Sequence, residues 1–281
     1  MSVRLPSSPS DVFLSVVLVG CQVLSIPLAM VRQAILWRRR PLLVWLSARP
    51  GGVGPSLRRI AFAQLARFVF KICLLTGMEG VVLRRVRCHG LDGLPRGGCV
   101  LALDHSPWGR VLARWAAAEQ FALVFAHRRW ARWAGPAHRA AVPSGLRRTT
   151  AELVRGRRVA VIIDDFVARG GCEVDFLDHR TRVAMRATWL AAQARVPVVP
   201  VTIYYRSGVI CVHFRPALSP GQTRGARAQT TRVLIEALAG RIERRPAEWQ
   251  DLFAFFDRRD TSGRRSVDPG AVRGSGWMPV R

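Results

Sequence analysis

The stretch Cys99–Leu103, with the sequence CVLAL, decides the fold class, and it is followed at once by the polar pair Asp104-His105. A short apolar run that ends at polar residues is typical of a strand buried on both faces of a parallel sheet. Val159–Ile163 (VAVII) has the same form and ends at Asp164-Asp165. Because the carboxyl ends of parallel strands meet at one edge of a sheet, we expect the two polar pairs to lie close together there.

The rest of the chain alternates between strand-like and helix-like stretches, which predicts an α/β fold with a central, mostly parallel sheet flanked by helices. A turn-rich segment, residues 91–98, precedes the first buried strand. The further predicted strands are 81–88 (an edge strand), 121–126, 197–204 and 209–214. The predicted helices are 109–118, 147–155, 181–194 and 226–244.

Composition and charge limit the classes of function. The 281 residues are 49% hydrophobic, which provides for a sizeable core, and the net charge is +26. Such a charge indicates an anionic partner: a membrane surface, an acidic protein or a nucleic acid. Nucleic acid is disfavoured, because the arginines are spread along the whole chain and an apolar segment opens it. The six cysteines form no CxxC pair, so we expect reduced, mostly buried thiols and no metal site.

The N-terminus predicts a membrane anchor. The twenty residues from Val12 to Val31 carry no charge and would span roughly 30 Å as a helix, the thickness of one bilayer core. Arg32 and the run Arg38–Arg40 follow, so the positive-inside rule places the remainder on the cytoplasmic side of a bacterial inner membrane. Three alternatives stay open: a helix lying in the interface, a buried core helix and a lipoprotein signal ending at Cys21.

These observations divide the chain into three parts. Residues 1–40 form the predicted anchor with its basic flank, residues 41–256 the α/β domain, and residues 257–281 a basic tail with the composition of a disordered segment. The apolar stretch Leu57–Leu83 within the domain contains interspersed arginines. It is open to two interpretations, a packing helix or a helix resting on anionic lipid.

His105 is the first candidate for chemistry. It lies between a buried strand and a predicted helix, where an imidazole could take a proton from an attacking hydroxyl. A structural histidine, whose ring only forms hydrogen bonds within the loop, explains the same pattern. The residues alone leave both interpretations open.

A series of motifs resembles the lipid A biosynthesis lauroyl/myristoyl acyltransferases, within the glycerolipid acyltransferase superfamily. The opening is Arg87–Gly98 followed by CVLALDHSPWGR, and the resemblance extends over residues 10–258. The later motifs are Leu146–Asp164 (helix, glycine turn, strand and terminal Asp), Asp175–Leu177, Thr181–Pro200 and Ile242–Trp249.

The resemblance implies a reaction and its partners. In that family a histidine deprotonates an acceptor hydroxyl, which attacks an acyl thioester without a covalent acyl-enzyme, and no cofactor takes part. The implied donor is acyl carrier protein or acyl-CoA, and the implied acceptor is a hydroxyl of an amphiphilic lipid such as a lipid A precursor. Acylation of a phospholipid or lysophospholipid is the alternative within the enzyme class.

The sequence departs from the family at one critical position. The family carries Asp or Glu five positions after the histidine, where this chain has Arg110. A guanidinium has only donors and cannot accept a hydrogen bond from imidazole. Either Asp164 or Asp165 supplies the carboxylate, or His105 works unaided at a reduced rate, or the protein has lost catalysis and retains binding.

Four further residues are candidates for substrate contact. Arg110, Arg147 and Arg148 could bind a phosphate of a lipid headgroup or of the carrier's phosphopantetheine, although a solvated surface arginine explains each equally simply. Trp108 lies at the start of the predicted helix 109–118 and either lines an acyl channel or packs in the core. Glu248 and Trp249 are expected to be a packing element near the C-terminus and not part of the site.

Overall fold

The computed structural model describes most of the central domain and parts of the N-terminal segment. The described residues are 12–14, 16–21, 23–25, 46–48, 53–76, 78–106, 108–119, 121, 123–125, 146–167, 171–206, 208–246, 249, 252 and 255–256. The predicted tail, 257–281, lies outside them.

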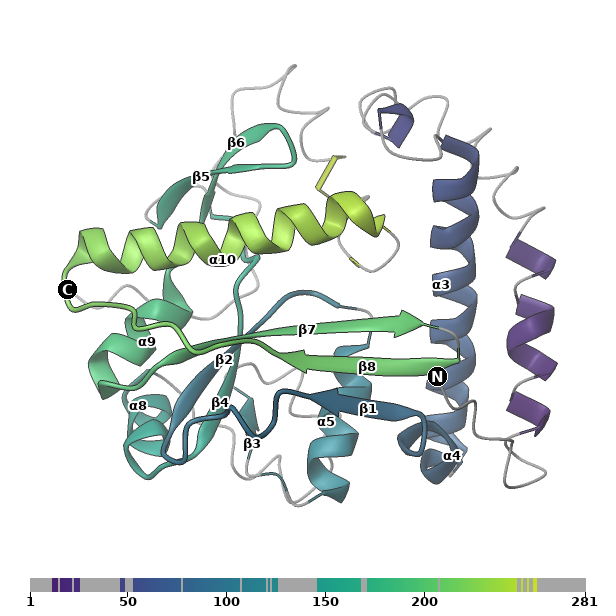
Figure 1. Ribbon diagram of the computed structural model, residues 1–281, viewed down its shortest axis with the longest axis horizontal. Helices are drawn as coiled ribbons and strands as arrows, with labels where there is room; N and C mark the ends of the chain where they lie inside the picture. The colour runs from purple at the N-terminus through teal and green to yellow at the C-terminus, as the bar shows by residue number, and fades with distance from the viewer. Residues whose placement is uncertain are drawn as a thin grey trace, which may run out of the picture.

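The described part of the chain has a six-stranded sheet at its centre, in the order β1-β8-β7-β2-β4-β3 (Figure 1). Neighbouring strands run parallel, except that β7 and β8 are antiparallel. The prediction of a mostly parallel sheet is therefore confirmed. The strands are β1 (Val86–His89), β2 (Cys99–Leu103), β3 (Leu123–Phe125), β4 (Arg158–Ile162), β7 (Val198–Arg206) and β8 (Val209–Phe214).

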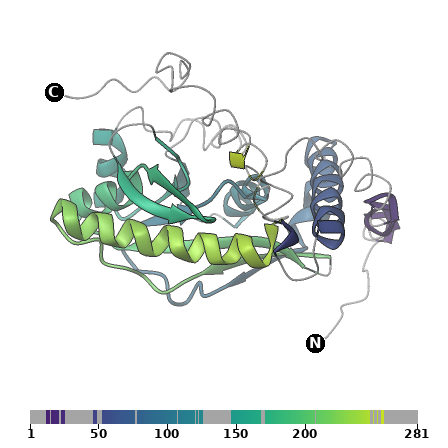
Figure 2. The ribbon, with the colours of Figure 1, turned by 90° about the horizontal axis from the view of Figure 1, so that it is seen from above.

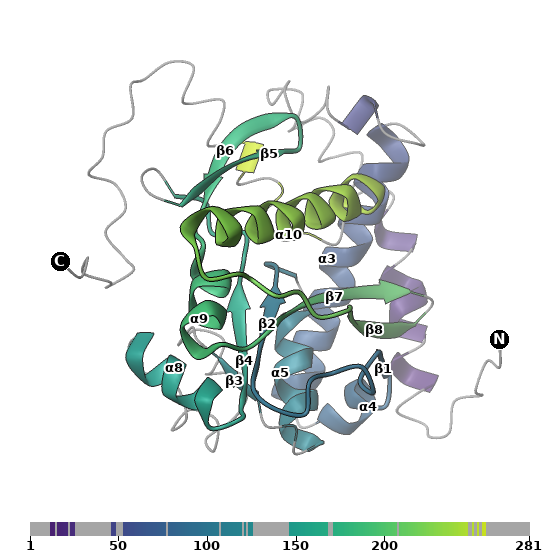
Figure 3. The ribbon, with the colours of Figure 1, turned by 60° about the vertical axis from the view of Figure 1, so that its left-hand side comes forward.

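Helices pack on both faces of this sheet (Figures 2 and 3). On β2, Val100 and Ala102 join a core cluster with α9 and α10, while Leu101 and Leu103 join a second cluster with α4 and α5. A strand covered on both faces needs this continuous apolar run. The helices are α3 (Val53–Leu75), α4 (Glu79–Leu83), α5 (Gly109–Ala118), α8 (Leu146–Val154), α9 (Arg186–Ala194) and α10 (Arg224–Arg244).

The predicted edge strand 81–88 is wrong over its first residues. Residues 79–83 form the short helix α4, and the strand β1 begins only at Val86. The β-branched pair Val81 and Val82 is buried on that helix, so its strand propensity is overridden by tertiary packing. The prediction of an edge position holds, because β1 is the end strand of the sheet that the described residues form.

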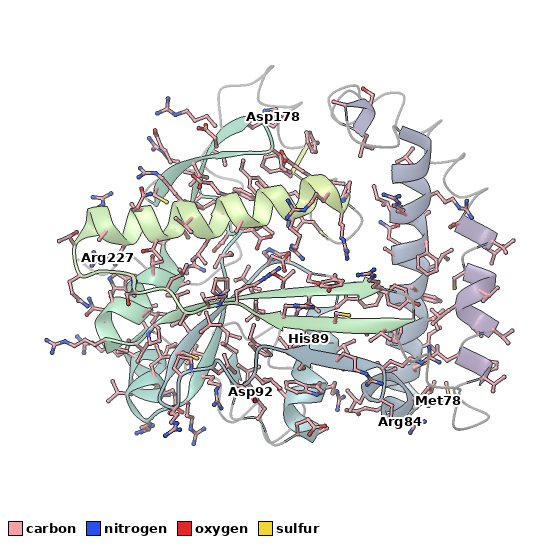
Figure 4. The ribbon with its side chains drawn as sticks, in the orientation of Figure 1. Met78, Arg84, His89, Asp92, Asp178 and Arg227 are labelled. Atoms are coloured by element: carbon pink, nitrogen blue, oxygen red, sulfur yellow. The ribbon has the colours of Figure 1, made fainter. Side chains whose placement is uncertain are left out.

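The predicted helix 181–194 is wrong over its first residues. Residues 172–183 form an antiparallel hairpin of β5 (Cys172–Phe176) and β6 (His179–Val183), and α9 begins at Arg186. The turn residues Leu177 and Asp178 have φ of 51° and 64°, as a two-residue hairpin turn requires. Asp178 marks its tip in Figure 4. This hairpin packs against α10 and contributes aromatic side chains behind the candidate site.

A helical N-terminal segment lies alongside α3 (Figures 1 and 2). Leu14, Leu18 and Cys21 are buried, whereas other apolar residues of the segment face outward. Among the described residues, no helix is at once long enough and apolar enough to cross a membrane. The predicted spanning helix is therefore not confirmed, and its residues 26–31 fall outside the described part of the chain. The six cysteines are free thiols, four of them buried.

Candidate active site

The two polar pairs do meet at one edge of the sheet. Strands β2 and β4 are parallel and in register, with Leu103 opposite Ile162, and Ile163 N–H continues the ladder to the carbonyl of Leu103 at 2.8 Å. The segments that follow the two strands therefore start side by side. The close approach of the Asp104-His105 and Asp164-Asp165 pairs, expected from the strand pattern, is confirmed.

His105 is bound to the carboxylate of Asp164 by both its ring and its backbone. Its Nδ1 atom lies 2.8 Å from Oδ1 of Asp164. Its backbone N–H donates to the same group, 3.2 Å from Oδ1 and 3.1 Å from Oδ2. The carboxylate has no exposed surface, while one third of the His105 side chain is exposed. The pair thus joins a buried anion to an imidazole that reaches the surface.

A third donor completes the shell of Asp164. The indole N–H of Trp249 donates to Oδ2 at 2.6 Å, and Trp249 is itself only 3% exposed. The sequence interpretation of Trp249 as a packing element alone is therefore incomplete. Asp164 and Trp249 are 85 positions apart in the sequence, so no local pattern could reveal this contact.

Asp104, the residue before His105, binds a different partner. Its buried carboxylate forms an ion pair with Arg241 near the end of α10. The same guanidinium donates to the backbone carbonyl of Ile203 on β7 at 3.3 Å. Arg241 thus ties α10 to the loop that carries His105. The sequence reasoning missed it, because one arginine among so many carries no distinguishing signal.

The residues after His105 lead directly into the core. The Ser106 hydroxyl donates to the carbonyl of Ile203, and the backbone N–H of Trp108 donates to that hydroxyl, both at 3.3 Å. Trp108 is 1% exposed. Its ring stacks on Tyr205 and meets Phe70 edge-on, with centroids 5.4 Å apart in each pair. The structure thus places Trp108 in an aromatic cluster, and its predicted contact with substrate stays a prediction.

The other predicted residues do not join the His105–Asp164 pair. Asp165 forms an ion pair with Arg186 of α9 at 2.9 Å, so it is directed to another partner. Arg147 and Arg148 are exposed in the first turn of α8. Arg110 lies in the first turn of α5, and its side chain is outside the described part of the structure. The substrate-binding roles of these arginines remain predictions.

The arrangement is suited to general base chemistry. A buried carboxylate accepts only, so the Nδ1 atom of His105 carries the proton and Nε2 is the basic nitrogen of the ring. The carboxylate also stabilises the imidazolium that forms when Nε2 takes up a proton. Among the described residues, no three His, Cys, Asp or Glu side chains are grouped so as to hold a metal ion.

Part of the chain matches a known protein family. Residues 131–256 match the family model described as bacterial lipid A biosynthesis acyltransferase. The chain is also similar to the crystal structure of the 1-acyl-sn-glycerophosphate (LPA) acyltransferase PlsC from Thermotoga maritima. The identity is 12%, the coverage 83% of this chain and 97% of that one, and the TM-score 0.40. No curated protein matches the sequence. The resemblance to the bacterial lipid A biosynthesis acyltransferases is therefore confirmed, over residues 131–256 of the chain.

Proposed function

We propose that this protein is a lipid acyltransferase that moves a fatty acyl chain from an acyl thioester to a hydroxyl of a glycolipid such as a lipid A precursor. The observation that carries the proposal is the 2.8 Å contact between Nδ1 of His105 and Oδ1 of Asp164. This contact supports the proposal at the position where the sequence departs from the family, Arg110. A carboxylate from the neighbouring strand takes the place that the family fills from the following helix.

The reaction follows from the roles of the two side chains. Nε2 of His105 removes the proton of the acceptor hydroxyl while its oxygen attacks the thioester carbonyl carbon. The tetrahedral adduct then collapses, the carbon–sulfur bond breaks, and the imidazolium returns the proton to the leaving thiolate. The carboxylate of Asp164 stabilises the transient cation. The products are the acylated lipid and the free thiol of the donor.

Acyl carrier protein is the donor that the charge favours. The net charge of +26 suits docking of an acidic protein, because complementary charge speeds encounter and fixes orientation. Acyl-CoA carries anionic phosphates and is the alternative donor. A salt-sensitive rate with the carrier-linked donor supports the first choice.

Exposed apolar side chains support attachment to a membrane. On the N-terminal helical segment they include Phe13 and Val16, and on α3 they are Phe68 (59% exposed) and Ile72 (40% exposed). Neighbouring apolar groups left in water are unfavourable, and a bilayer removes them from it. We propose the cytoplasmic side of a bacterial inner membrane as the location, with an anionic lipid surface that suits the net charge.

The test is acyl transfer in membranes from a radiolabelled carrier-protein thioester to a panel of amphiphiles that includes a lipid A precursor and a lysophospholipid. The wild type is compared with His105→Ala and Arg110→Glu, and with His89→Ala as the matched control. His89, labelled in Figure 4, lies at the end of β1, and β8 and β7 separate β1 from β2 in the sheet.

We expect transfer by the wild type and by His89→Ala, and its loss in His105→Ala. Transfer only to the lysophospholipid identifies the alternative acceptor. Transfer by Arg110→Glu alone contradicts the proposal, because the chain would then be a disabled homologue that retains binding.

A further inference from the structure

We infer that Trp249 is a positioning residue for the acyl-transfer reaction, because its indole N–H fixes the carboxylate of Asp164 in the orientation that holds His105. The inference rests on the proposed function of the His105–Asp164 pair. It assigns a chemical role to a C-terminal residue that packing alone does not require.

The donors are divided between the two oxygens of Asp164. Oδ1 faces Nδ1 of His105 at 2.8 Å, whereas Oδ2 faces Nε1 of Trp249 at 2.6 Å. The backbone N–H of His105 lies between them, at 3.2 Å and 3.1 Å. With side-chain donors on both oxygens, the carboxylate resists rotation about its Cβ–Cγ bond. Its plane, and with it the ring of His105, is set by Trp249.

The indole is itself fixed by its neighbours. Trp249 packs edge-on against Phe176 of β5, with ring centroids 5.3 Å apart. Phe255 lies 5.6 Å away and Phe166, two residues beyond Asp164, lies 6.3 Å away. These three rings pack against the indole, and its one polar atom is directed at Oδ2 of Asp164. A ring fixed by packing can hold the carboxylate that it binds in one orientation.

The hydrogen bond from Trp249 can have either of two roles. In the first, the hydrogen bond only satisfies a buried indole, and Trp249 contributes to stability alone. In the second, it orients the carboxylate, and removing it misaligns His105. The variant Trp249→Phe keeps an aromatic ring in the cluster and removes the N–H. For the positioning role we expect kcat to fall by roughly 10- to 100-fold with KM unchanged, the scale of a small misplacement of a catalytic group.

A double-mutant cycle distinguishes the two. Trp249→Phe is made in the wild type and in Asp164→Ala, with Phe255→Leu as the matched control that contacts the indole through packing only. Single-turnover assays with radiolabelled donor resolve the low rates, and thermal unfolding verifies that each variant folds. We expect Trp249→Phe to slow the wild type but not Asp164→Ala, and Phe255→Leu to have the same effect in both. An equal loss from Trp249→Phe in both backgrounds overturns the inference.

A second measurement does not depend on activity. Selective ¹⁵N labelling of Trp and His makes the indole N–H of Trp249 and the Nδ1–H of His105 visible by NMR. We expect the indole signal to move upfield in Asp164→Ala, and the His105 signal to be lost to solvent exchange in Trp249→Phe but retained in Phe255→Leu. A wild type that shows both signals but transfers no acyl group contradicts the proposed function alone. A His105 signal unchanged in Trp249→Phe overturns the positioning role whatever the activity.

Discussion

The Nδ1 atom of His105 lies 2.8 Å from Oδ1 of Asp164, across 59 residues of sequence and between two neighbouring parallel strands. The pair is therefore fixed by sheet register and does not depend on the helix that follows His105. Under the proposed function, His105 therefore needs no carboxylate at position 110.

The two adjacent aspartates are expected to differ sharply when each loses its charge. Asp164→Asn should lower kcat by about four orders of magnitude, as loss of the orienting carboxylate does in serine proteases. Asp165→Asn should retain most activity, since Asp165 pairs with Arg186 at 2.9 Å. Acyl transfer measured on both variants side by side tests this, and equal losses would show that the pair is wrongly assigned.

The buried ion pair of Asp104 and Arg241 predicts a loss of stability when one partner is removed. Arg241→Met leaves the Asp104 carboxylate buried without its counter-charge, which should cost about 3–5 kcal/mol of unfolding free energy. The double variant Asp104→Leu with Arg241→Met should recover part of that loss, because no buried charge remains. Denaturant unfolding of the four proteins measures the coupling, and strictly additive changes would argue against a buried pair.

His213 makes stability depend on pH. Burial, followed by the charges of His89, Arg215 and Arg245, lowers the pKa of His213 below its ordinary value near 6.5, while the Tyr204 hydroxyl lies 2.9 Å from its Nε2 atom. In this pH range the unfolded chain therefore binds a proton at His213 more readily than the folded protein does. The contribution of the neutral ring is thus present above pH 6.5 and is lost as the pH falls through the lowered value.

Unfolding free energies between pH 7 and pH 5 should therefore fall less steeply in His213→Gln than in the wild type. His89→Gln should raise the pKa of His213 in an NMR titration, because one of its causes is removed. A titration curve of His213 that is indifferent to His89 would contradict this role of the stacked pair, whose ring centroids are 4.4 Å apart.

Gly98, immediately before β2, should tolerate no side chain. A Cβ atom there would lie 2.1 Å from the carbonyl oxygen of Leu153 at the end of α8, whereas one at Gly97 meets nothing within 4 Å. Gly98→Ala should lower the unfolding free energy by roughly 1–3 kcal/mol, and Gly97→Ala should change it little. Comparison of the two melting temperatures decides the matter, and similar values would be inconsistent with this contact.

The part of the site that could be predicted from the sequence is the part that lies directly after the strand ends. CVLAL and VAVII are buried runs that pair as parallel neighbours, so the polar residues that follow them share one edge of the sheet, as the sequence pattern predicts. The choice between Asp164 and Asp165 could not be made, because it depends on which side chain turns inward. Only Asp164 is buried.

The hairpin β5–β6 and the contacts of Trp249 and Arg241 were not predicted, for different reasons. The hairpin β5–β6 alternates buried Cys172, Val174 and Phe176 with polar residues, a strand signal that the following helix obscured. Its pairing is supported by Glu173, which binds Arg180 and Arg182 of the opposite strand. Trp249 and Arg241 reach the site from the far end of the chain. Their roles appear only when α10 is folded back across the sheet.

The bond between Trp249 and Asp164 has a consequence for the order of synthesis. The indole is made 85 residues after the carboxylate it binds, so a nascent chain on the ribosome holds His105 and Asp164 long before their last donor emerges. Until then the carboxylate has its two contacts from His105 but lacks the indole. The third donor to the carboxylate can therefore bind only after the two strands that precede His105 and Asp164 have been made.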